Sequence, residues 1–143
     1  IVRWPGEVKP DTLCDTPVIS MDFYPTFLEV AGLHSGKQPI DGKSLVELFK
    51  QGGELKRKAI YFHYPNYAWH MGNRLGSVIR EGDWKLIRNY DDNSLELYNL
   101  SKDLSEKRNL AQQQPKLAAR LNRQLGKWLK ETNAPMPRPP LNN

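Results

Sequence analysis

The pattern between Gly76 and Leu100, GSVIREGDWKLIRNYDDNSLELYNL, consists of three short runs of apolar and polar residues separated by two turn-forming segments. Runs of this kind joined by tight turns predict three short strands. Gly82-Asp83 separates the first two strands and suits a two-residue hairpin turn. Residues 91–94 (DDNS) separate the second and third with side chains that favour turns. We therefore expect an antiparallel meander.

A helical pattern follows the meander, between Pro115 and Glu131. Leucines and a tryptophan recur there every three or four residues, which predicts one apolar helix face. The opposite face is basic. The apolar positions are Leu117, Leu121, Leu125, Trp128 and Leu129, and the basic positions are Arg120, Arg123, Lys127 and Lys130.

Three further elements are expected before the meander. Residues 59–64 (AIYFHY) have the aromatic and β-branched composition of a strand, which would make the sheet four-stranded. Pro25–Ala31 is expected to be a helix that presents the apolar residues Phe23 and Phe27 on one face. Ser44–Phe49 is expected to be a short helix that begins with a Ser44–Glu47 capping box. The pattern thus predicts an α+β fold, a small antiparallel four-stranded sheet packed by a C-terminal amphipathic helix.

Composition narrows the class of protein. The chain has 143 residues, 38% hydrophobic and 26% charged, which is enough for one modest core. Its net charge of +5 permits an anionic partner without demanding one. No apolar run approaches the roughly 20 residues of a membrane-spanning helix. The single cysteine, Cys14, excludes an internal disulfide.

Candidate binding residues lie in or near the loop between the strand expected at residues 59–64 and the meander. His63 ends that strand, and the loop carries Trp69, His70 and Arg74. Arginine suits sulfate, phosphate or carboxylate because its donors match their oxygens. The loop either contacts a ligand or packs on itself or on a further domain, and His63 either contacts the ligand or is a hydrogen-bonded residue of the sheet.

Other chemistry finds little support. His63 and His70 have no acidic or cysteine partner at metal-ligand spacing, and Asp103, Glu106 and Asn109 lack the glycine of a calcium-binding loop. The basic helix face lacks the aromatic platforms of nucleic-acid binders, so we expect no nucleic-acid partner. Cys14 is expected to be a small apolar residue near a buried edge rather than a nucleophile.

Several segments, in this order, resemble the C-terminal region of the sulfatases, that is, the arylsulfatases and their bacterial polysaccharide-directed relatives. The one departure noted is Leu104, where the family commonly has proline after Asp103. The resembling segments are IVRWPG at 1–6, DTPVISMDFYPTFLEVAG at 15–32, IDGKSL at 40–45, YFHYP at 61–65, IREGDWKLI at 79–87 and ELYNLSKDLSEKRNL at 96–110.

The resemblance implies a part of a larger alkaline-phosphatase-like enzyme. Sulfatases hydrolyse sulfate esters with calcium and a formylglycine made from Cys or Ser in a C/S-x-P/A-x-R motif. Cys14 does not match, because Thr16 and Val18 stand where the motif needs Pro or Ala and Arg. Calcium and formylglycine are therefore expected in a missing N-terminal part, and no catalytic or metal-binding residue is assigned here. The expected division is 1–50, the last strand and helix of a truncated α/β domain, then 51–132, the C-terminal subdomain, and 133–143, a proline-rich tail.

Two functional hypotheses follow. In the first, the chain is the C-terminal portion of a sulfatase, inactive alone, that forms a cleft wall and contacts a sulfated carbohydrate or aryl sulfate through His63, His70 and Arg74. In the second, it is a free-standing binding or interaction module for sulfated sugars. The resemblance suggests a periplasmic or secreted protein, and the Phe23–Phe27 face together with Ile1-Val2 is expected to be exposed and to favour self-association.

Overall fold

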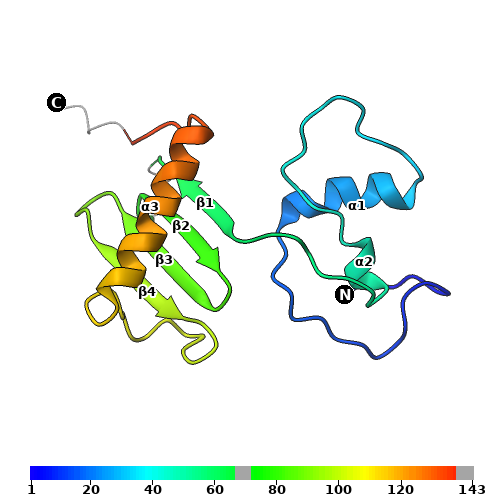
Figure 1. Cartoon of the computed structure of the whole chain (residues 1–143), viewed down its shortest axis with the longest axis horizontal. Helices are drawn as coiled ribbons and strands as arrows, with labels where there is room; N and C mark the ends of the chain where they lie inside the picture. Colours follow the sequence, from blue (N-terminus) through cyan, green and yellow to red (C-terminus); the bar gives the residue numbers. More distant parts are fainter. Residues whose placement is uncertain (67–71, 138–143) are drawn as a thin grey trace. The chain divides into compact units, whose positions relative to one another are not determined.

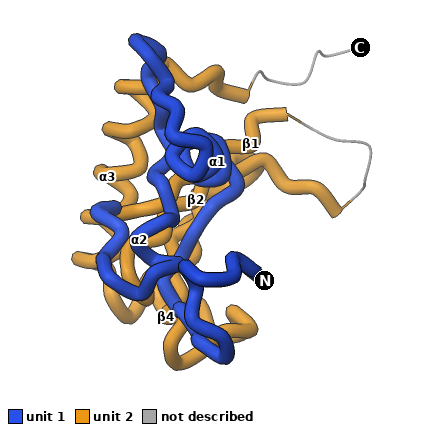
Figure 2. The backbone as a smooth tube through the Cα atoms, turned by 90° about the vertical axis from the view of Figure 1, so that its right-hand side faces the viewer, with its two compact units in different colours: residues 1–57 blue, residues 58–143 orange. Residues whose placement is uncertain are grey.

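The computed structural model describes residues 1–66 and 72–137. The chain forms two compact units, residues 1–57 and residues 58–143 (Figure 2). Each unit is described by itself. No helix in the described ranges is long and apolar enough to cross a membrane.

The second unit is built on a four-stranded antiparallel sheet in the order β1-β2-β3-β4. Gly82, with a φ of 56°, makes the turn between β2 and β3 at a backbone conformation that glycine adopts readily. The expected meander and the fourth strand are both confirmed. The bounds are β1 Ile60–Tyr64, β2 Gly76–Glu81, β3 Trp84–Asn89 and β4 Leu95–Asn99.

The helix α3, Pro115–Glu131, covers one face of this sheet (Figure 1). Pro115 occupies the first turn, where its missing N–H costs nothing. Tyr61 of β1 stacks on Trp128 of α3 with ring centroids 4.7 Å apart. The core between helix and sheet is fully or almost fully buried, and it consists of Ile79, Leu86, Leu97, Ala118, Leu121, Leu125 and Leu129. The predicted four-stranded sheet with its C-terminal helix is therefore confirmed, whereas the strand expected before it, at the end of an α/β domain, is not observed in residues 1–57.

The first unit contains a 3₁₀ turn, η1 (Ser20–Asp22), and two helices, α1 (Phe23–Val30) and α2 (Val46–Phe49). Asp22 organises this unit although its side chain is fully buried. Its carboxylate accepts hydrogen bonds from the backbone N–H of Ile19 and of Lys43, both at 2.9 Å, and pairs with the Arg57 guanidinium. A buried carboxylate is tolerated only with such partners. Because Lys43 and Arg57 are 21 and 35 residues away from Asp22, these contacts join segments far apart in sequence.

Two local expectations for this unit are wrong. The first helix begins at Phe23 rather than Pro25, because η1 leads directly into it. The capping box does not form: α2 begins at Val46 behind Leu45, and the Ser44 hydroxyl instead accepts from the Val46 N–H at 3.3 Å.

The α1 face that carries Phe23 and Phe27 is exposed, as expected. Phe23 is 48% exposed and Phe27 67% exposed, and their rings stack with centroids 6.0 Å apart. Ile1 and Val2 are also exposed. Large apolar side chains gathered on a surface are typical of a contact face.

Candidate functional site

The base of the loop between β1 and β2 is held by a chain of hydrogen bonds. His63 pairs with Ser77 across the two strands, and its Nδ1 lies 2.7 Å from the Ser77 hydroxyl oxygen. The His63 Nε2 lies 2.7 Å from the carbonyl oxygen of Pro135, beyond the end of α3. A carbonyl oxygen only accepts, so Nε2 carries a proton and, in the neutral ring, Nδ1 accepts from Ser77.

Tyr90 extends this chain. Its hydroxyl lies 2.7 Å from the Ser77 hydroxyl oxygen, and its backbone N–H donates to the carbonyl of Leu75 at 3.0 Å. The Tyr90 ring also meets the His63 ring edge-on at 6.1 Å. Ser77 is fully buried and Leu75 almost fully buried. The residue next to Leu75 in the loop therefore projects from a fixed base.

That residue is Arg74, whose side chain is exposed. Its positive charge lowers the pKa of both Asp92 and Glu96, although hydrogen bonds are the larger cause for each carboxyl. The hydrogen bond from Tyr98 is the largest cause for Glu96, at 2.5 Å, and Asn89 donates to its other oxygen at 2.8 Å. Burial, and then this contact with Glu96, raise the pKa of Tyr98 to about 12. A rigid carboxylate thus lies near a solvent-exposed arginine.

The structure brings two of the three predicted contact residues to the same end of the sheet. His63 pairs with Ser77 across the two strands, and Arg74 lies two residues before Gly76, where β2 begins. His70 lies outside the described residues. Both ring nitrogens of His63 already have partners within the chain, so its prediction as a substrate contact requires one partner to be exchanged.

Sequence reasoning missed Ser77 and Tyr90. The strand alternation carries a signal for Ser77, because it lies two residues before the buried Ile79 and shares its face. A serine at such a position needs a hydrogen-bond partner. No pattern indicates Tyr90, whose role depends on the turn after β3.

Cys14 is exposed, so its predicted place near a buried edge is wrong. Within residues 1–66 and 72–137, no three His, Cys, Asp or Glu side chains gather in a way that could hold a metal ion.

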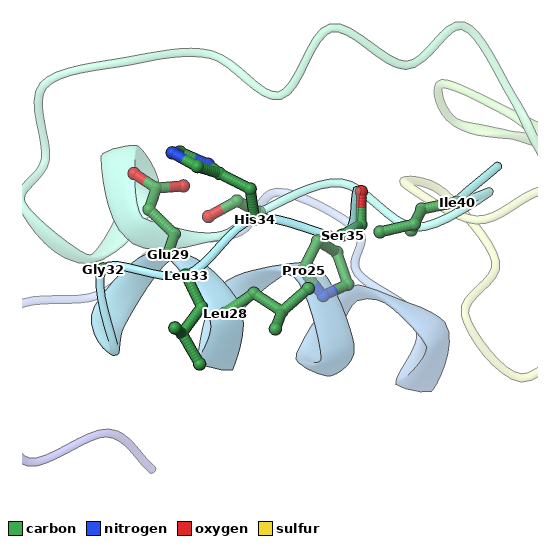
Figure 3. Close-up of a pocket in the computed structure, with 9 residues that line it drawn as sticks. Pro25, Leu28, Glu29, Gly32, Leu33, His34, Ser35 and Ile40 are labelled. Carbon is green, nitrogen blue, oxygen red and sulfur yellow. The ribbon is translucent and has the colours of Figure 1, made fainter. Parts of the chain in front are cut away.

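A separate open pocket of about 400 Å³ lies beside α1 in the first unit (Figure 3). Pro25, Leu28, Leu33 and Ile40 give it an apolar lining, while Glu29 and His34 are polar. All its lining residues belong to the first unit, and no predicted contact residue is among them.

Comparison with known proteins assigns the chain to a family. Residues 1–134 match the family described as N-sulphoglucosamine sulphohydrolase, C-terminal. The chain belongs to this family of sulfatase C-terminal regions. The resemblance found in the sequence is thereby confirmed.

Two curated relatives illustrate this assignment. A sulfatase of Formosa agariphila is 37% identical to the chain, covering 94% of it and 27% of the relative. An N-acetylglucosamine-6-O-sulfatase of Bacteroides thetaiotaomicron is 32% identical, covering 77% of the chain and 20% of the relative. The sulfatase region described here therefore spans about a quarter of the length of these relatives or less.

A solved structure agrees with the fold. A protein in complex with its substrate D-glucosamine-2-N,6-O-disulfate is 32% identical to this sulfatase region, with a TM-score of 0.67. The match covers 80% of the chain and 24% of that protein. The four-stranded sheet with its C-terminal helix is thus an arrangement found within sulfatases.

Proposed function

We propose that this chain is the C-terminal part of an enzyme that hydrolyses sulfate esters of carbohydrates, and that it forms a wall of the substrate cleft. Support comes from the family match over residues 1–134 and from relatives about four times as long. The chain has no C/S-x-P/A-x-R motif at Cys14. We therefore place the catalytic centre, with calcium and formylglycine, in the rest of the enzyme and expect the chain alone to be inactive.

The observation that carries the proposed substrate contact is the exposed guanidinium of Arg74 on a fixed loop base. Glycosidic substrates with several sulfates present oxygens that a guanidinium binds with two parallel hydrogen bonds. We propose that Arg74 binds a sulfate or carboxylate group of the substrate other than the sulfate that is hydrolysed. His70, in the same loop, is proposed as a second contact. His63 is proposed to contact a sugar hydroxyl in place of the Pro135 carbonyl.

Such contacts matter to catalysis although they do not touch the reacting bond. An enzyme uses binding energy from remote parts of a substrate to orient the reacting group. A positively charged wall would also favour polyanionic substrates over neutral sugars. The proposed role of this region is thus selection and orientation of the substrate.

A second candidate is a free-standing module that binds sulfated sugars. It is favoured by one observation, that the Arg74 end of the sheet and the core beneath it belong entirely to the second unit. A unit with its own core can hold a binding site without a catalytic domain. This candidate predicts sugar binding with no sulfate release from the native protein.

The test is kinetic and uses the native full-length polypeptide with a sulfated glucosamine as substrate. Arg74→Ala should raise KM roughly 10- to 100-fold, because a hydrogen bond to a charged group contributes about 1.5–3 kcal/mol. Arg108→Ala is the matched control, since Arg108 is also exposed and its side chain donates to Gln113 at 3.2 Å, with no acidic partner within residues 1–66 and 72–137. Equal kinetics of the two variants would contradict the proposed contact, and binding without any sulfate release would favour the second candidate.

A further inference from the structure

The outer face of α3 carries a stripe of five cations, which we call the basic stripe: Lys116, Arg120, Arg123, Lys127 and Lys130. At 100° per residue, all five lie within about 80° of the helix circumference. The helix rises about 1.5 Å per residue, so the stripe is roughly 21 Å long. The only acidic residue in α3 is Glu131, at its last position.

The helix that carries the basic stripe packs against the sheet with its opposite side. The leucines that α3 buries lie on the opposite side of the helix, and Leu121 and Leu125 are completely inaccessible to solvent. Figure 1 shows α3 lying along one face of the sheet, so the other side of the helix is free of the sheet. The backbone positions of the five cations therefore keep a fixed spacing along the helix before any ligand binds.

Three of the five cations are electrostatically unsatisfied. Arg120 pairs with Glu81 at 2.6 Å, and Lys127 pairs with Glu131 at 3.6 Å. Lys116, Arg123 and Lys130 are exposed and have no ion-pair partner within the described part of the chain. They are seven residues apart, which places neighbouring charges about 10 Å from each other along the helix.

A regular row of unpaired cations matches a polymer whose negative charges also repeat. We propose that the basic stripe is a docking surface for a sulfated polysaccharide chain. The choice of polymer rests on the proposed function, because the substrate of a carbohydrate sulfatase is a sulfated sugar. Docking of the polymer on α3 would raise the local concentration of substrate by multivalency, without a new contact at the Arg74 end.

The opposing candidate is nucleic acid. Single-stranded nucleic acid binds where cations alternate with aromatic rings on which bases stack. The outer face of α3 has no such ring, because its one aromatic residue, Trp128, is stacked on Tyr61 against the sheet. The chemistry of the stripe is charge alone, which suits the exposed sulfates of a polysaccharide.

The experiment measures binding of heparin to the 143-residue chain at several salt concentrations. The triple variant K116Q/R123Q/K130Q should bind roughly tenfold more weakly, since each exposed charge pair contributes a factor of about 1.5 to 5. Its affinity should also depend less steeply on salt, because fewer counterions are released. Circular dichroism checks that the variant keeps its helix.

The matched control is K9Q/K37Q/K102Q, which removes the same charge at three exposed lysines outside α3. It should bind heparin within about twofold of the parent chain, as expected of charges outside the contact. Equal loss in the two triple variants would overturn the proposal, and so would binding of desulfated heparin or duplex DNA as tight as that of heparin.

The outcome is separable from that of the proposed function. Sulfate release from a small sulfated sugar by the full-length polypeptide does not involve the stripe, so K116Q/R123Q/K130Q should leave it unchanged. Absence of sulfate release would refute the proposed function while heparin binding through the stripe could persist. Sulfate release together with stripe-independent heparin binding would refute only the docking surface.

Discussion

The hydrogen-bond chain at the base of the loop between β1 and β2 predicts which group donates and which accepts in each bond. Because the Pro135 carbonyl fixes the proton on His63 Nε2, Ser77 donates to Nδ1 and Tyr90 donates to Ser77. Ser77→Ala removes two hydrogen bonds of a fully buried side chain. At about 0.5–1.5 kcal/mol for each bond, the free energy of unfolding should fall by about 1–3 kcal/mol.

Tyr90→Phe removes only one of these bonds, so it should cost about 0.5–1.5 kcal/mol. In the Ser77→Ala background that bond is already gone, and the double variant should be little less stable than Ser77→Ala alone. The coupling energy of the cycle should therefore equal about one hydrogen bond. Ser105→Ala, at an exposed serine, is the control and should change stability by less than about 0.5 kcal/mol.

The assay is urea denaturation at pH 8, followed by circular dichroism, with nitrogen NMR to identify the histidine tautomer. Strictly additive costs of the two substitutions would show that the hydroxyls do not interact. A His63 ring with its proton on Nδ1 would contradict the direction of the chain. Either result would remove the argument that the base of the Arg74 loop is fixed by this network.

Five further predictions concern other parts of the chain. Arg57→Leu leaves the buried carboxylate of Asp22 without its charged partner. It should destabilise the first unit by about 3–5 kcal/mol, which would be measured as faster hydrogen exchange in α1. Burial alone would raise the pKa of Asp22, but hydrogen bonds from Arg57, Lys43 and Ile19 outweigh it and lower the pKa. The stability that this group contributes is thus present above its unfolded pKa of about 3.9 and is lost as the pH falls through the lower folded value, which acid titration of α1 exchange can follow. Leu125→Ala should cost about 2–5 kcal/mol in urea denaturation, because the side chain is fully buried against the sheet. Tyr98 should ionise near pH 12 in an absorbance titration, and ionisation near the ordinary value of about 10 would show that burial and the hydrogen bond to Glu96 do not raise its pKa. Phe27→Ser should reduce self-association of the chain in sedimentation, since it interrupts the exposed apolar face of α1.

The second unit could be predicted well because its signals are local. The apolar period of 3.6 and a proline at the first position define α3 between Pro115 and Glu131, as observed. Short apolar runs on either side of the Gly82 turn define β2 and β3. In these segments, local propensity and tertiary packing favour the same structure.

The first unit was predicted less well because its contacts are not local. Asp22 is satisfied by Lys43 and Arg57, which are 21 and 35 residues away. No periodic pattern identifies such a pairing. The short helix α2 likewise begins without its expected capping box: the Ser44 hydroxyl accepts from the Val46 N–H, and the Leu45 N–H donates to the distant Thr26 hydroxyl at 3.0 Å.

The candidate site could be predicted from the sequence only in part. Arg74 and His63 were identified by residue type and by their place at the ends of strands. The contacts of Ser77 with His63 and Tyr90, and of Tyr90 with Leu75, depend on strand register and on a turn, which residue type does not reveal. Sequence therefore indicated which residues to propose as substrate contacts but not how their surroundings are held.

The central claim is that the chain is the C-terminal part of a longer sulfatase. The most direct test is the intact mass of the native polypeptide, together with its ability to release sulfate from a sulfated glucosamine. The account predicts a polypeptide about four times as long as this chain, in keeping with the 27% of its relative that the chain covers, and measurable sulfate release. A native polypeptide of about the length of this chain that releases no sulfate would contradict it.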